Sequence, residues 1–235
     1  MTFASLPTVS PQRFAQGRTL AQWLAFLSSP ENLDRPNNAG AAPRRDFTAA
    51  MRSRHEGHPL NEHQQAALKE LAAMSNGPAK LLIIGEDWSS DCRRDMPTLV
   101  RVGEAAGMEV RIFIRDSAQG KEPSPYAATD AAGNGDLMHQ FLNRKNGNVF
   151  QSIPVGAFFT KDMEYIYHFT EFAMIYQKDP FLAKLRQRHS GEGDAEYQKR
   201  TGEAFMDLQA SPFFHIWACA AVDEIITNLW ERLVL

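Results

Sequence analysis

The sequence has little of what marks secreted, membrane-embedded or disulfide-stabilised proteins. It contains only 2 cysteines in 235 residues, too few for a disulfide scaffold. No apolar stretch is long enough to span a bilayer. The first residues lack the charged start and the apolar run of a secretory signal. We therefore expect a cytoplasmic protein without a membrane partner.

An excess of charge of one sign is also missing. The 25 Lys and Arg residues against 28 Asp and Glu residues give a formal net charge of -3, which offers nucleic acid no electrostatic attraction. A hydrophobic fraction of 43% over 235 residues is enough for one substantial core. We expect a globular protein with no nucleic-acid partner.

The clearest pattern lies in the middle of the chain and predicts an α/β fold. Residues 80–85 form a short apolar run typical of a strand buried on both faces, and residues 109–114 alternate as a second strand. An amphipathic helix between them, ending near residue 106, favours a right-handed crossover between parallel strands. Residues 155–160 and 164–169 are β-rich and predict an antiparallel hairpin.

Helical segments are expected on both sides of this centre. Residues 1–59 are interpreted as a helical extension, with helices over 19–27 and about 46–54. Asn61 is a typical N-cap and opens the core, which is expected to cover residues 60–175. Within that core, an irregular insertion over 117–135 precedes a helix over 136–143.

Residues 176–235 are expected to form a second helical extension. Its last helix, about 213–233, carries a broad aromatic and aliphatic face. Such a face must be covered, either by packing on the core or by a second copy in a homodimer. Cys219 lies in this helix and is interpreted as a packing residue.

Another cysteine stands at the start of the central helix. The segment Trp88-Ser89-Ser90-Asp91-Cys92 follows the first central strand and leads into that helix. The positive end of a helix dipole favours a thiolate, so this is a position where a thiol can become reactive.

These features resemble the thioredoxin superfamily. The segment WSSDC (88–92) is similar to the family's W-C-x-x-C motif, and Pro97 stands where thioredoxins carry a helix-kinking proline. Ile153-Pro154 matches the family's cis-proline. More narrowly, EDWSSDCRRDMP resembles a branch of bacterial thioredoxin-like proteins with an E-D-W-C-x-D-C motif. The resemblance covers roughly residues 60–172 and implies a central mixed sheet flanked by helices.

The resemblance also implies roles for individual residues. In the family, the first motif cysteine attacks a substrate disulfide, the second resolves the mixed disulfide, and the cis-proline presents backbone groups to an extended substrate chain. The catalytic positions are then Ser89 and Cys92, and the substrate-binding positions are Trp88, Ser90, Asp91, Ile153 and Pro154. The implied partner is a protein or a small-molecule thiol or disulfide, with no cofactor and no metal.

Two departures from the family pattern limit this chemistry. Ser89 occupies the attacking position, and a serine hydroxyl cannot form a disulfide, so dithiol exchange within the motif is impossible. The family's buried acid, six residues before the first motif cysteine, is replaced by Ile83. Both the attacking thiol and its proton-relay partner are therefore absent.

Three functions remain open for a motif of this kind. Cys92 is either a low-pKa thiol, aided by Arg93 and Arg94, or a small packing residue. The first reading predicts a monothiol redox protein or a thiol- or peptide-binding protein, and the second predicts a non-catalytic interaction module. A peroxiredoxin-like Cys92 peroxidase is less favoured, because the proline that this family carries just upstream is missing.

Two clusters of polar residues are further candidate binding sites. His55, His58 and His63, with Glu56 and Glu62, have the side chains of a zinc site but follow no known zinc spacing, which favours solvated loop residues. The neighbouring Glu86 and Asp87 are interpreted as a solvated strand end, with a ligand-facing acidic pair as the alternative.

Overall fold

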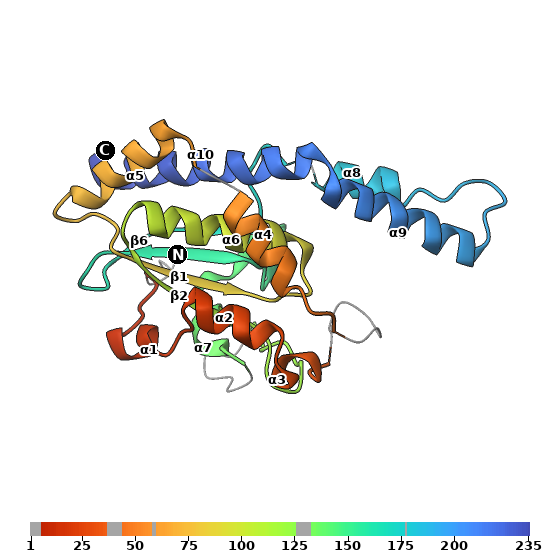
Figure 1. Cartoon of the computed structure of the whole chain (residues 1–235), viewed down its shortest axis with the longest axis horizontal. Coiled ribbons are helices and arrows are strands. Elements are labelled where there is room, and N and C mark those ends of the chain that lie inside the picture. The colour runs from red at the N-terminus through yellow and green to blue at the C-terminus, as the bar shows by residue number, and fades with distance from the viewer. Residues whose placement is uncertain (1–5, 37–43, 58–59, 126–132, 177) are drawn as a thin grey trace.

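A mixed β-sheet forms the centre of the structure, a computed structural model that describes residues 6–36, 44–57, 60–125, 133–176 and 178–235 (Figure 1). The strands are β1 Lys80–Gly85, β2 Glu109–Ile114, β3 Asn143–Lys145, β4 Asn148–Phe150, β5 Val155–Phe159 and β6 Tyr165–Thr170. The central sheet has four strands in the order β2-β1-β5-β6, and β3 and β4 form a separate hairpin.

Helices make up most of the remaining structure. They are α1 Pro11–Ala15, α2 Leu20–Leu27, α3 Pro30–Leu33, α4 Thr48–Gly57, α5 Glu62–Ala73, α6 Ser90–Ala105, α7 Gly135–Met138, α8 Lys178–Leu185, α9 Asp194–Ala210 and α10 Pro212–Val234, with the 3-10 helix η1 His139–Phe141. None of those in the described ranges combines the length and the apolar character needed to cross a bilayer.

The two inner strands set the geometry of the sheet. After Lys80, β1 is apolar and buried, which suits an inner strand with helices on both faces. β1 pairs in parallel with β2, and α6 forms the crossover between them. On its other side β1 pairs antiparallel with β5, with Ile84 opposite Val155. This register brings the end of β1 next to the start of β5.

The helices cover the sheet in a definite arrangement. α6 packs on β1 and β2, and α10 lies over α5, α6 and β6. α2 packs against β2, which is an edge strand, and against α4. Figure 1 shows α6 and α10 on one side of the sheet and α1 and α7 on the other.

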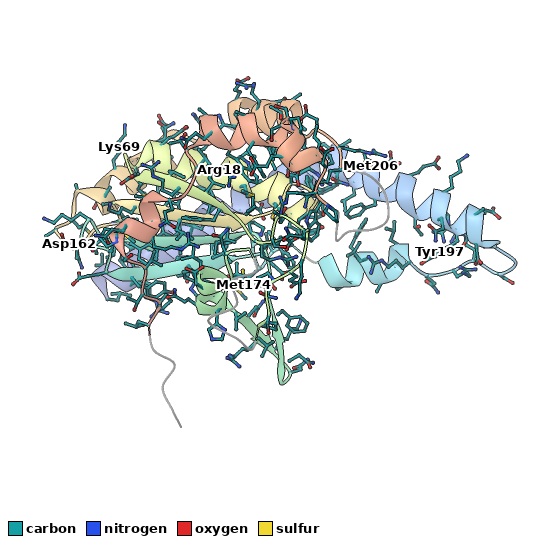
Figure 2. All side chains as sticks on the ribbon, turned by 90° about the horizontal axis from the view of Figure 1, so that it is seen from below. Arg18, Lys69, Asp162, Met174, Tyr197 and Met206 are labelled. Atoms are coloured by element: carbon teal, nitrogen blue, oxygen red, sulfur yellow. The ribbon has the colours of Figure 1, made fainter. Side chains whose placement is uncertain are left out.

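The C-terminal part divides into a packed helix and an arm. The buried side chains of α10 are Phe214, Ala218, Ala221, Val222, Ile225 and Leu229, on the face that meets the core. α8 and α9 instead project away from the core as a helical hairpin (Figure 1), and Figure 2 shows Met206 where this arm joins the core and Tyr197 farther out. A homodimer formed through α10 stays a prediction.

The predicted α/β, thioredoxin-like fold is confirmed. The strands over 80–85 and 109–114 have the predicted bounds, and Asn61 caps α5 with a capping box. The helix predicted over 136–143 is shorter, because α7 and η1 end at Phe141 and β3 begins at Asn143. The hairpin of β3 and β4 turns through Asn146 and Gly147, both at positive φ, and was not predicted.

Candidate functional site

The motif turn joins the end of β1 to the start of α6. Ser89 is the N-cap of α6, and its hydroxyl oxygen accepts a hydrogen bond from the backbone N–H of Cys92 at 3.4 Å. A serine at this place satisfies one of the free N–H groups of the first helical turn. Ser89 therefore has a structural role as the N-cap of α6.

The thiol of Cys92 is completely buried beneath this turn. The Cys92 side chain has no exposed area, and its Sγ atom accepts a hydrogen bond from the backbone N–H of Glu86 at 3.4 Å. A Cβ atom built on Gly85 would lie only 2.9 Å from Cys92 Sγ, so the glycine is needed for this close packing.

Burial decides the protonation state of this thiol. Desolvation raises the pKa of Cys92 above its ordinary value, and the hydrogen bonds from the Glu86 amide and the Ser89 side chain oppose this shift without cancelling it. The helix N-terminus contributes only about 0.3 to 1 kcal/mol in favour of a thiolate. Cys92 is therefore a protonated thiol at neutral pH.

The peptide bond between Ile153 and Pro154 is cis and lies beside the motif. Because Ile84 pairs with Val155, continuing the antiparallel register by one step places Pro154 opposite Gly85. The Pro154 carbonyl accepts a hydrogen bond from the Glu171 N–H at 2.8 Å. In the described part of the chain, the N–H and C=O groups of Ile153 form no hydrogen bond.

The residues predicted to form the site differ in exposure. Trp88, Ser89 and Ser90 are half-buried, whereas Asp91, Cys92, Ile153 and Pro154 are buried. Sheet register and helix position bring the turn and the Ile153-Pro154 bond to one end of the sheet. The half-buried face of the turn is thus the part that a binding partner can reach.

The interpretation of Glu86 and Asp87 as a solvated strand end is wrong, and of the alternative ligand-facing pair only Asp87 lines a cavity. Both carboxylates are buried, with 0% and 1% of their surface exposed. Arg35 Nη2 lies 2.9 Å from Glu86 Oε1, and Asn32 Nδ2 donates to Asp87 Oδ2 at 2.8 Å. Arg44 pairs with both carboxylates.

This buried ionic network attaches the N-terminal extension to the motif turn. A buried carboxylate is tolerated only with charged or hydrogen-bonding partners, and here these partners come from a segment some fifty residues earlier. The backbone N–H of Asp116 also donates to Glu86, at 2.9 Å, and links the network to the end of β2. Adjacent acids directly after a buried strand were the only sequence signal for it.

The two arginines that follow Cys92 are occupied by other groups. Arg94 has no exposed surface, binds Asp95 through its Nε at 2.7 Å and binds Asp91 at 3.2 Å. Arg93 donates to the carbonyl oxygens of Asp87 and Trp88 at 3.0 and 2.8 Å. Their side chains shape the turn rather than activate the thiol.

A cavity of about 360 Å³ lies next to the turn, on the side of α4 and the junction between α9 and α10. It is lined by Arg44, Arg45, Phe47, Ala50, Arg54, Asp87, Trp88, Arg93, Met206, Gln209 and Phe214. Of these residues, only Trp88 belonged to the predicted site. Asp87 and Arg93 flank it in the turn and in α6, and the remaining lining residues come from both helical extensions, whose proximity to the motif no local pattern indicates.

The described members of the histidine cluster, His55 and His63 with Glu56 and Glu62, do not form a metal site. His55 Nε2 lies 3.0 Å from a carboxylate oxygen of Glu104 on α6, and His63 is exposed beside Glu62. His58 lies outside the described residues. Within the described ranges, no group of three or more His, Cys, Asp and Glu side chains is arranged to hold a metal ion. Cys219 is half-buried, with its Sγ 3.6 Å from His215 Nε2.

The fold, a central mixed sheet flanked by helices, is thioredoxin-like. A family model described as Thioredoxin matches residues 45–121, which supports the thioredoxin-like superfamily for the part of the chain that carries the turn. A search of curated proteins finds no match.

Two solved structures are similar over nearly the whole chain. One is a protein of unknown function from Pseudomonas aeruginosa, with a TM-score of 0.51 and 14% identity, covering 95% of this chain and 98% of that one. The other is an HIV epitope scaffold, with a TM-score of 0.50 and 13% identity, covering 95% and 99%. At these identities the likeness concerns the fold alone.

Proposed function

We propose that this protein is a thioredoxin-like binding protein whose motif carries out no dithiol exchange. The observation that carries the proposal is the complete burial of the Cys92 thiol, which raises its pKa and keeps it protonated at neutral pH. With serine at position 89, the motif has neither an attacking thiol nor an exposed resolving thiol. A redox role is suggested only by the family to which the turn is similar.

The binding surface in this proposal is the half-buried face of the turn together with Ile153. Ile153 is only 6% exposed, but its backbone hydrogen-bonding groups have no partner within the described ranges and would pair with an extended peptide bound across the turn. Main-chain pairing of this kind is a common way to hold a peptide against the edge of a folded domain. Trp88, with Ser89 and Ser90, would contact the side chains of such a peptide.

A monothiol function is the second candidate. The helix N-terminus and the hydrogen bonds that Cys92 Sγ accepts favour the thiolate, as in a reactive cysteine. Burial outweighs them, because a fully desolvated thiolate is costly and a reagent has no path to the sulfur. The alkylation rate of the Cys92 thiol in the native protein distinguishes the two candidate functions.

The test is the alkylation rate of Cys92 in a Cys219→Ser variant, where it is the remaining thiol. Native protein is treated with iodoacetamide at pH 7 to 10 and the adduct is quantified by mass spectrometry. We expect negligible labelling of native protein and complete labelling in denaturant, which serves as the control. Labelling of the native protein at the rate of an unhindered thiol, or faster, would support the monothiol function and exclude our proposal.

A second experiment tests whether the binding cleft is intact. In the Cys219→Ser background, Ser89→Cys restores two cysteines at the motif spacing. Because position 89 is half-exposed at the helix N-terminus, we expect this variant to reduce the disulfides of insulin in the presence of dithiothreitol faster than its parent. A folded variant with no gain over the parent would argue against a thioredoxin-type cleft.

A further inference from the structure

The cavity beside Trp88 is built from three separate parts of the chain. The first part contributes Phe47, which directly precedes α4, and Arg54 within α4. The motif turn and the start of α6 contribute Trp88 and Arg93, and the start of α10 contributes Phe214. Figure 2 places Met206, another lining residue, at the base of the α8–α9 arm. The cavity therefore depends on both helical extensions as well as on the turn.

Positive charge is concentrated on the wall of this cavity. Arg44 is neutralised by Glu86 and Asp87. Among the described residues, Arg45, Arg54 and Arg93 form no ion pair. Asp87, the single carboxylate among the described lining residues, is already bound to Arg44 and Asn32. The wall thus has a surplus of guanidinium groups without a counter-ion.

The two inner arginines are held in place by neutral groups. The guanidinium of Arg93 lies 4.3 Å from the centre of the Phe47 ring and donates to Gln209 Oε1 at 3.0 Å. The guanidinium of Arg54 lies 5.0 Å from the centre of the Phe214 ring. Aromatic faces and carbonyl oxygens orient a cation without neutralising it. Both side chains therefore keep a full positive charge and spare N–H donors.

Burial and repulsion from neighbouring arginines destabilise the charges of Arg54 and Arg93. Burial lowers the pKa of Arg54, and the neighbouring charge of Arg94 lowers it further. Burial likewise lowers the pKa of Arg93, the nearby charges of Asp87 and Asp91 oppose this shift without cancelling it, and Arg54 adds a small decrease. An anion in the cavity would relieve this repulsion, and low exposure to solvent would strengthen its attraction to the guanidinium groups.

We propose that this cavity binds an organic anion, with its carboxylate against Arg54 and Arg93 and its apolar group among Phe47, Trp88 and Phe214. A volume of about 360 Å³ suits a small molecule or a single side chain with its terminal carboxylate. The aromatic wall favours an apolar group, which an inorganic ion does not supply. This site is separate from Ile153 and does not depend on any chemistry of Cys92.

The first test uses 4-phenylbutyrate as the probe and isothermal titration calorimetry on the full chain. We expect saturable binding with one site, weakened by added sodium chloride, because part of the attraction is electrostatic. The neutral isostere 4-phenylbutyramide should bind at least about tenfold more weakly, since it lacks the charge-assisted hydrogen bonds. Acetate and inorganic phosphate, which lack the phenyl group, should bind more weakly than the probe.

A pair of variants on α4 identifies the site. Arg54→Gln removes a lining charge, whereas Arg52→Gln removes an exposed charge on the same helix that does not line the cavity. We expect the affinity for 4-phenylbutyrate to fall about tenfold in Arg54→Gln and to stay unchanged in Arg52→Gln. Circular dichroism and the melting temperature of both variants establish that they are folded.

Several outcomes would overturn the proposal. They are the absence of saturable binding at millimolar probe, equal affinities for the carboxylate and the amide, equal affinities for phosphate and 4-phenylbutyrate, and equal losses in the two variants. Each of these outcomes would show that the guanidinium charge or the aromatic wall does not contribute to binding. None of them bears on the alkylation of Cys92, so the two proposals fail independently.

Discussion

Arg35 and Glu86 form a buried ion pair, 2.9 Å from nitrogen to oxygen, between the N-terminal segment and the motif turn. Their side chains are 3% and 1% exposed, so neither charge is solvated. Arg44 approaches the second oxygen of the same carboxylate at 3.3 Å. The position of the turn, and with it the cavity beside Trp88, therefore depends on residues from a segment outside the part of the chain that resembles thioredoxins.

Removing the charge of Glu86 should strongly destabilise the protein. Glu86→Gln preserves the shape of the side chain but leaves Arg35 without its carboxylate, and an uncompensated buried charge costs about 3 to 5 kcal/mol. We expect a loss of about 3 kcal/mol in the free energy of unfolding, measured by urea denaturation at pH 7, because the amide still accepts a hydrogen bond.

Glu31→Gln is the matched control for this prediction. Glu31 pairs with Arg18 at 3.6 Å, but its side chain is 72% exposed. Solvent screens such a pair, so we expect a loss below about 1 kcal/mol. Equal losses in the two variants would mean that the network around Glu86 does not hold the turn.

The capping role of Ser89 gives a second prediction. Ser89→Ala removes the oxygen that accepts the Cys92 N–H and should lower the stability by about 1 kcal/mol. Ser90→Ala is the control, since Ser90 is the first residue of α6 and lies past the cap. Thermal unfolding of both variants measures the difference. A loss confined to Ser90→Ala would contradict the assignment of the cap.

Much of the central fold follows from local patterns that the sequence displays directly. The apolar run of β1 and the alternation of β2 predict their own bounds, because burial on both faces or on one face dictates those patterns. The cap of α5 is predicted equally well by Asn61. Such features depend on neighbouring residues, so no knowledge of the tertiary structure is needed.

The surroundings of the motif could not be predicted in the same way. The side-chain partners of Glu86 and Asp87 lie more than forty positions away, and a lone acidic pair is far more often solvated than buried. The burial of Cys92 depends equally on tertiary contacts, including the close approach of Gly85. Charge pairing between distant segments has no periodicity, so it leaves no pattern for sequence reasoning to detect.

The pairing of Arg13 with Asp136 predicts a pH dependence of stability. Arg13 Nε lies 2.7 Å from Asp136 Oδ2 and connects α1 to α7, and its hydrogen bond lowers the pKa of Asp136. A carboxylate whose folded pKa lies below its unfolded value stabilises the folded state above the unfolded pKa, near 4. That stabilisation is lost as the pH falls through the folded pKa.

Asp136→Asn should therefore destabilise the protein at pH 7 but not at acidic pH. Because the Asp136 side chain is 50% exposed, solvent screening limits the expected loss to below about 1 kcal/mol. Urea unfolding of both proteins from pH 7 to pH 2.5 should show the two stabilities converging below pH 4. The exposed Asp162, which forms no ion pair among the described residues, gives the control Asp162→Asn. A difference that persists unchanged at pH 2.5 would show that the loss comes from packing rather than from the charge of Asp136.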